Sequence, residues 1–140
     1  MDYDLIANAS DVSVLIRFEE RIDPKIASKV RNAGISVRNA ALPWVTEIIP
    51  SYNELLVVFD QCQVAPAEAL NAIAETVKGG GVSAEQKPRL FRIPVCYGGE
   101  LGPDIGNVCD YTGLAEEEVI RLHSAPEYLI YMIGFTSGFP

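Results

Sequence analysis

The sequence contains a single histidine, His123, and only three cysteines, Cys62, Cys96 and Cys109. The cysteines are odd in number and no two of them have C-x-x-C spacing. A zinc site would therefore have to be assembled from carboxylates, and we reject it. Because the cysteines lie in or beside apolar segments, we expect buried, reduced thiols.

Basic residues and long apolar runs are also scarce. The sequence has eleven Lys and Arg residues and nineteen Asp and Glu residues, so the formal net charge is −8. The basic residues form no stripe. Such a chain repels phosphate backbones, which argues against a nucleic-acid partner. No apolar run approaches the roughly 18 residues that cross a bilayer. The N-terminus Met1-Asp2-Tyr3-Asp4 is acidic where a secretory signal would be basic, so we expect a cytoplasmic protein with no membrane partner.

What the sequence does contain is a globular composition, with about half of its residues apolar and a fifth charged. Before residue 79, apolar periodicity predicts four strands and two helices. The strands are expected at 3–8, 12–18, 44–50 and 54–60, and the helices after Asp23 and from near Pro66. The order strand, helix, strand, strand, helix indicates a ferredoxin-like α+β layer with an added N-terminal strand.

Both helices carry an apolar stripe. Asp23 and Pro24 form a helix start, and Gly34 is expected just past the helix end. The first stripe consists of Ile22, Ile26, Ala27, Val30 and Ala33. The second consists of Ala67, Leu70, Ile73, Ala74 and Val77.

Three adjacent glycines and a polar run mark a linker at residues 79–88. We therefore expect one domain at 1–78 and another at 89–140. In the second domain, strands are predicted at 90–96 and 128–135, and short helices at 103–111 and 116–123.

A glycine-rich turn with Gly98, Gly99, Gly102 and Gly106 follows the strand predicted at 90–96. Its spacing matches neither the dinucleotide-binding nor the P-loop motif. These glycines could let the backbone approach a ligand, and the helix start near Asp104 could offer N–H groups to an anion. The residues alone favour a simpler interpretation, a tight turn capped by Asp104.

His123 is the natural general acid or base, since histidine changes charge near neutrality. It nevertheless follows Val119 and Ile120 at helical spacing, which by itself favours a histidine satisfied within the core. The run Glu116-Glu117-Glu118 suits the positive end of a helix dipole better than a metal site. Tyr97 could present its phenol to a ligand, although strand tyrosines more often bury the ring.

Five short motifs occur in a recognisable order. They are Tyr97-Gly98-Gly99, Gly102-Pro103-Asp104, Thr112-Gly113-Leu114, Gly134-Phe135 and Gly138-Phe139-Pro140. In this order they resemble the signature of the KipI/PxpB family, whose members are also called allophanate hydrolase subunit 1 or 5-oxoprolinase subunits. The resemblance is specific from about Arg92 onward. It implies a ferredoxin-like N-terminal domain followed by the start of a cyclophilin-like β-barrel, within which the chain stops.

The resemblance also implies a function. Members of the family resemble a subunit of an ATP-dependent 5-oxoprolinase, or of a related amide or allophanate hydrolase complex. Such a subunit works with a homologous cyclophilin-like partner subunit and a third component, and the complex uses the ATP. The alternative is a KipI-like inhibitor that binds a histidine kinase and has no chemistry of its own.

The family motifs single out the site residues. His123 is implied as the catalytic group, transferring a proton or orienting the substrate. The residues implied to contact the substrate are Tyr97, Gly98, Gly99, Asp104, Phe135 and Phe139. An incomplete barrel leaves the predicted strand at 128–135 without neighbours, so we also expect the chain to self-associate or to need a partner.

Overall fold

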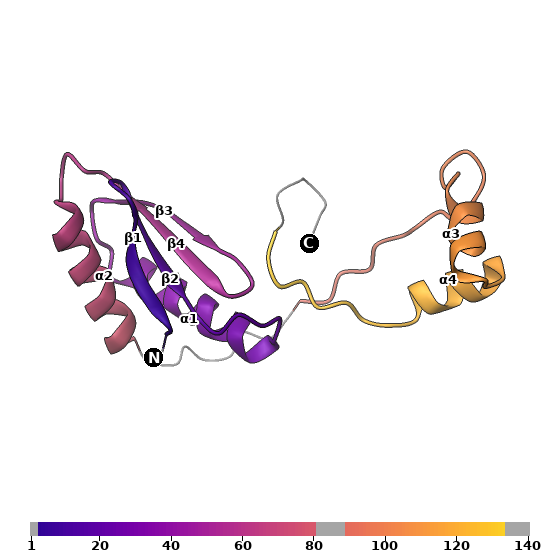
Figure 1. The fold of residues 1–140 in the computed structure, drawn as a ribbon, viewed down its shortest axis with the longest axis horizontal. Coiled ribbons are helices and arrows are strands. Elements are labelled where there is room, and N and C mark those ends of the chain that lie inside the picture. Colours follow the sequence, from indigo (N-terminus) through magenta and orange to yellow (C-terminus); the bar gives the residue numbers. More distant parts are fainter. Residues whose placement is uncertain (1–2, 81–88, 134–140) are drawn as a thin grey trace. The chain divides into compact units, whose positions relative to one another are not determined.

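A computed structural model describes residues 3–80 and 89–133 of the chain. The described residues form two compact units: 3–80 with 130–133, here the N-terminal unit, and 89–129, here the helical unit. The N-terminal unit contains a sheet and two long helices, and the helical unit contains two short helices (Figure 1). The chain is therefore α+β, as the sequence predicted.

The sheet has four antiparallel strands in the order β1-β2-β4-β3. The strands are β1 (Leu5–Ser10), β2 (Ser13–Arg17), β3 (Val45–Pro50) and β4 (Glu54–Phe59). Short turns join β1 to β2 and β3 to β4, so each hairpin pairs locally, and β2 and β4 then pair at the centre. The added N-terminal strand, β1, thus occupies one edge of the sheet.

The core lies between one face of this sheet and the two helices, α1 (Pro24–Asn39) and α2 (Pro66–Gly79). Helix α1 packs on β3 and β4, α2 packs on β1 and β2, and the helices contact each other (Figure 1). Alternation along β2 and β4 places every second apolar side chain in this layer. The buried strand residues are Val14, Ile16, Leu55, Val57 and Phe59. Burial of each such side chain stabilises the fold by about 1.5–3 kcal/mol.

The start of α1 is confirmed. The carboxylate of Asp23 accepts the backbone N–H of Lys25 at 2.7 Å, and Pro24 occupies the first turn. The expected stripe is buried from Ile26 onward, but Ile22 is 71% exposed because it precedes the helix.

The expected end of α1 at Gly34 is wrong, since the helix continues to Asn39. Val37 supplies a further buried turn, and Gly34 sits where the helix approaches the sheet. A Cβ added at Gly34 would lie 3.4 Å from Cδ1 of Leu55 and 3.6 Å from Cγ2 of Ile48. This glycine marks close helix–sheet packing and not a helix stop.

In α2 the buried residues are Ala69, Ile73 and Val77, with Leu70 packed against the core. Ala67, which the sequence placed in the stripe, is exposed. Ala74, also expected in the stripe, is half-buried. The buried face of α2 is therefore shifted around the helix axis, toward Ala69.

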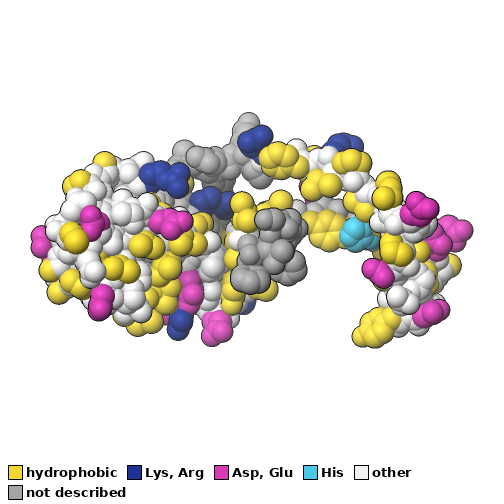
Figure 2. Space-filling model, turned by 90° about the horizontal axis from the view of Figure 1, so that it is seen from above, with side chains coloured by type: hydrophobic (Ala, Val, Ile, Leu, Met, Phe, Trp, Pro, Cys, Tyr) yellow, Lys and Arg dark blue, Asp and Glu magenta, His cyan; other side chains and the backbone are white. Residues whose placement is uncertain are grey.

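The two strands predicted in the second domain are not formed over their described residues. Residues 90–96 and 128–133 run without a ladder partner, and residues 134–135 lie outside the described chain. A strand needs a neighbour to receive its backbone hydrogen bonds, and none is supplied within residues 89–133. Large apolar side chains in both segments are exposed, and Ile133 is 84% exposed. Apolar side chains are correspondingly prominent on the surface in Figure 2.

The short helices of the second domain are present as α3 (Ile105–Thr112) and α4 (Glu116–Ser124). The expected burial of the cysteines is wrong for Cys62 and Cys96, which are exposed, whereas Cys109 is half-buried. Cys62 lies in the turn after β4 and Cys96 in the unpaired segment, so neither reaches the core.

Within the predicted linker at 79–88, Gly79 is the last residue of α2, and residues 81–88 lie outside the described chain. No helix of residues 3–80 or 89–133 has the length and apolar content that a membrane crossing requires.

Candidate functional site

The glycine turn folds back on itself in the helical unit. Gly98 and Gly102 form an isolated antiparallel bridge, and the N–H of Gly102 donates to the carbonyl of Gly98 at 3.0 Å. Gly98 and Gly99 have positive φ values of 72° and 60°, which favour glycine. The side chains nearest to a Cβ built at Gly98 are Glu116, at 3.3 Å, and Ile105, at 3.7 Å. The turn therefore packs against the beginnings of both α3 and α4.

Helices α3 and α4 pack against each other (Figure 1). Gly113, with φ of 71°, closes α3 by donating its N–H to the carbonyl of Cys109 at 2.8 Å. The expected cap by Asp104 is wrong: Asp104 precedes α3 in a helical conformation, and its side chain makes no capping bond. The turn is held by its glycines and by its own backbone.

The turn and the end of α4 bring Tyr97 and His123 together. The phenolic oxygen of Tyr97 is 2.5 Å from Nδ1 of His123, and the ring centroids are 5.7 Å apart at an interplanar angle of 81°. Tyr97 is half-buried and His123 is exposed. The alternative of a histidine satisfied within the core is therefore wrong. An exposed imidazole with one nitrogen engaged can exchange protons or hydrogen bonds with a ligand at the other.

A second tyrosine holds the backbone at the same place. The hydroxyl of Tyr128 donates to the carbonyl oxygen of His123 at 2.8 Å, and its ring centroid is 5.9 Å from that of His123. This bond satisfies a carbonyl in the last turn of α4, where helices lack intrahelical donors. His123 thus has its ring bonded to one tyrosine and its backbone to another.

The acidic side chains at the start of α4, Glu116 to Glu118, are exposed to solvent or bound to a basic side chain of the same helix. Glu116 and Glu117 are exposed, and Glu118 accepts two hydrogen bonds from Arg121, at 2.6 and 2.9 Å. The Arg121 guanidinium lowers the pKa of Glu118, and the Glu118 carboxylate raises the pKa of Arg121. These features fit the helix-dipole interpretation.

Within residues 3–80 and 89–133, His, Cys, Asp and Glu side chains form no group of three or more that could hold a metal ion.

Of the residues that the sequence singled out, the structure brings together His123, Tyr97 and the turn at Gly98 and Gly99. Asp104 is exposed at the far end of this turn, and its side chain makes no hydrogen bond with His123. Phe135 and Phe139 lie outside the described residues. The bond from Tyr128 to the His123 backbone was missed, since a tyrosine five residues beyond a histidine carries no recognised motif.

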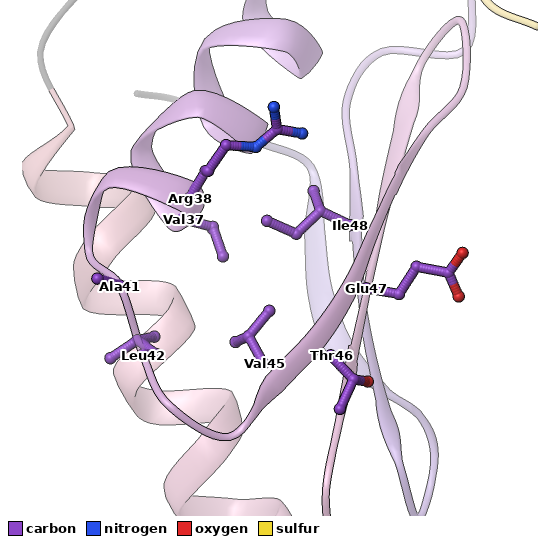
Figure 3. Close-up of a pocket in the computed structure, with 8 residues that line it drawn as sticks. All are labelled: Val37, Arg38, Ala41, Leu42, Val45, Thr46, Glu47 and Ile48. Carbon is purple, nitrogen blue, oxygen red and sulfur yellow. The ribbon is translucent and has the colours of Figure 1, made fainter.

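The N-terminal unit has a shallow hollow of about 380 Å³ between the end of α1 and β3. Figure 3 shows Val37, Val45 and Ile48 pointing toward one another there, whereas the carboxylate of Glu47 points away. The hollow lies at the edge of the apolar core. It lacks the set of polar groups pointing to one place that is typical of a substrate site.

Comparison with known proteins identifies the family of this chain. Residues 5–140 match the family described as the carboxyltransferase domain, subdomain C and D, and the chain belongs to this family. The KipI/PxpB resemblance of the sequence motifs is thereby confirmed.

Particular relatives carry a more specific name. The chain is 34% identical over 145 aligned residues to a protein of Bacillus subtilis (strain 168) named as a 5-oxoprolinase subunit, covering 96% of this chain and 60% of the relative. It is 31% identical to the protein of the same name from Escherichia coli O157:H7, covering 93% and 58%. The crystal structure of TTHA0988 matches with a TM-score of 0.71 at 27% identity, covering 89% of this chain and 24% of that one. The chain thus spans about 60% of the length of the curated relatives that it matches.

Proposed function

We propose that this protein is a subunit of a 5-oxoprolinase-type hydrolase complex. The observation that carries the proposal is the similarity of nearly the whole chain to proteins named as 5-oxoprolinase subunits, at 34% and 31% identity. It is supported by the pairing of Tyr97 with His123, since both belong to the segments that carry the family motifs.

In this proposal His123 transfers a proton to the substrate or orients it by hydrogen bonding. Opening a lactam to an amino acid breaks an amide bond, and the leaving nitrogen must gain a proton. An exposed imidazole beside a backbone turn can provide that proton or hold the amide in place. The turn from Gly98 to Asp104 forms part of the wall of the site, with Tyr97, Phe135 and Phe139 contacting the substrate.

The complex would use ATP, because hydrolysis of a stable lactam under cellular conditions calls for an activating group. The proposed partners are a homologous cyclophilin-like subunit and a third component, which would hold the nucleotide. The exposed apolar side chains at 90–95 and 128–133 support contacts with another chain. We place this complex in the cytoplasm.

The proposed architecture is a ferredoxin-like domain at 1–78, a linker at 79–88 and the start of a cyclophilin-like barrel at 89–140. In the N-terminal unit, β2, α1, β3, β4 and α2 follow the ferredoxin-like order, and β1 takes the edge position that a closing strand would occupy. The described residues separate into two compact units between residues 80 and 89, which supports the proposed boundary between the domains. Residues 130–133, however, group with the N-terminal unit.

Reconstitution tests the proposal. The protein would be combined with a cyclophilin-like subunit and a third component from the same organism, and 5-oxoproline hydrolysis would be measured with and without ATP. We expect ATP-dependent formation of glutamate by the combined proteins and none when this protein is omitted. Inhibition of a histidine kinase by the protein, without any lactam hydrolysis by the mixture, would replace the proposal with the KipI-like alternative.

A further inference from the structure

The contact between Tyr97 and His123 leaves the two nitrogens of the imidazole in different situations. Nδ1 lies 2.5 Å from the phenolic oxygen, while Nε2 has no hydrogen-bond partner among the described residues. In a neutral imidazole one nitrogen carries hydrogen and the other accepts. A phenol that donates to Nδ1 therefore leaves the hydrogen on Nε2, the nitrogen that remains available.

We propose that Tyr97 is a positioning residue that donates its hydroxyl to Nδ1 of His123, so that Nε2–H is the group presented to the substrate. This inference rests on the proposed function, because it concerns the same site. It assigns the hydroxyl of Tyr97 to His123 and leaves only the ring of Tyr97 for contact with a substrate. If His123 becomes charged, the hydrogen bond reverses, because Nδ1–H can then donate to the phenolic oxygen.

Two features of the helical unit support this role. Tyr97 directly precedes Gly98, so the bridge between Gly98 and Gly102 fixes the backbone that carries the phenol. The bond from Tyr128 to the carbonyl of His123 fixes the backbone that carries the imidazole. The phenol and the imidazole are thus each held close to a point of backbone restraint, which limits how far the pair can separate.

Nitrogen NMR on the 140-residue chain tests the tautomer without any assay of activity. The chain has one histidine, so ¹⁵N-histidine labelling gives signals from His123 alone. At a pH where the imidazole is neutral, we expect an unprotonated Nδ1 and a protonated Nε2. In Tyr97→Phe we expect the signals to move toward the average of two exchanging tautomers. A protonated Nδ1 in the wild type, or unchanged signals in Tyr97→Phe, would overturn the assignment.

Tyr111→Phe is the matched control. Tyr111 lies in α3 of the same unit, is 93% exposed and makes no side-chain hydrogen bond to a described residue. This substitution removes a hydroxyl of the same kind and should leave the His123 signals unchanged. An equal change in both variants would show that the effect does not come from the Tyr97 hydroxyl, and would also count against the inference.

Activity of the assembled complex provides the second readout. Loss of one hydrogen bond of ordinary strength corresponds to a decrease of about tenfold in rate. We expect Tyr97→Phe to lower kcat by about this factor with little change in KM, and to alter the pH profile of kcat. A raised KM with kcat and its pH profile unchanged would instead make Tyr97 a binding residue. If the NMR result holds but the complex hydrolyses no lactam, the positioning role stands and the proposed reaction fails.

Discussion

Gly102 lies so close to Gly98 that no side chain fits between them: an added Cβ at Gly102 would be 2.5 Å from the backbone nitrogen of Gly98. The carbonyl carbon of Tyr97 and the carbonyl oxygen of Cys96 would also lie within 3.3 Å of it. All three are backbone atoms, so no side chain can move aside to relieve the clash. The turn that presents Tyr97 to His123 therefore depends on glycine at position 102.

The first prediction is that Gly102→Ala opens this turn and destabilises the helical unit by about 1–3 kcal/mol, the usual cost of overpacking. Hydrogen exchange of the α3 and α4 amides is the measurement, because it reports on this unit directly. We expect faster exchange throughout both helices. Exchange as slow as in the wild type would show that the backbone bridge is not needed.

Gly106→Ala is the matched control, since a Cβ built there would meet no described atom within 4 Å apart from its chain neighbours and the backbone of its own helix. Gly106 is the second residue of α3, where alanine favours the helix by up to about 1 kcal/mol over glycine. We expect exchange in α3 to be unchanged or slower.

The second prediction concerns His123→Gln in the reconstituted complex. General acid–base groups contribute at least about a hundredfold to rate, and we expect a loss of that size in turnover. Thermal stability should change little because the side chain is exposed. Near-normal turnover would remove His123 from the chemistry, and a large loss of stability would give it a structural role instead.

Glu117→Gln serves as the control on the same helix. Glu117 is exposed, one turn before Arg121, and makes no hydrogen bond to a described side chain. A comparable loss of turnover in this variant would mean that the surface of α4 matters as a whole and that His123 has no special role.

The third prediction is an acid sensitivity of the N-terminal unit that depends on Asp60. Hydrogen bonds from the Gln63 amide and from the Cys62 backbone N–H lower the pKa of Asp60. When the pKa of a carboxyl group is lower in the folded state, its ionised form stabilises the fold at pH values above the unfolded-state pKa, which is about 4 for aspartate. This contribution is lost as the pH falls through the folded-state pKa. The free energy of unfolding should therefore fall on acidification, and fall less in Asp60→Asn.

Fluorescence of Trp44 during urea unfolding provides the measurement, because Trp44 is the only tryptophan of the sequence. Its ring packs edge-on against the ring of Phe59, with 6.3 Å between the ring centroids, so its emission should report on unfolding of the core. Unfolding would be followed near neutrality and below about pH 4. The control is Asp11→Asn, at an exposed turn residue without a side-chain hydrogen bond to the described chain. A pH dependence in Asp60→Asn that equals that of the control would contradict the assignment.

The fourth prediction is self-association of the isolated chain. The segments at 90–96 and 128–133 expose apolar side chains and unpaired backbone groups, which another chain can cover. Light scattering should give a mass above the 15.3 kDa of one chain, rising with concentration. Ile93→Lys and Ile133→Lys should lower that mass, whereas Asn71→Lys, on the exposed side of α2, should not. A strictly monomeric chain at high concentration would contradict this prediction.

Local sequence was sufficient for most of the N-terminal unit. Alternating apolar residues in β2 and β4 specify a buried face, because the side-chain direction along a strand repeats every two residues. Asp23 and Pro24 specify the start of α1 through bonds made within a few residues. The glycines at 98 and 99 indicate a turn, since positive φ values exclude most other residues.

Contacts between distant residues were decided only by the tertiary structure. The extension of α1 past Gly34 depends on how near the helix comes to Leu55, and the exposure of residues 90–96 depends on whether a neighbouring strand is available. The sequence singled out both Tyr97 and His123, but no periodicity relates positions 26 residues apart. Their contact requires the glycine turn and α4 to fold against each other. The sequence determined the elements because their bonds are local, and the tertiary structure decided the site because its bonds join residues far apart in the chain.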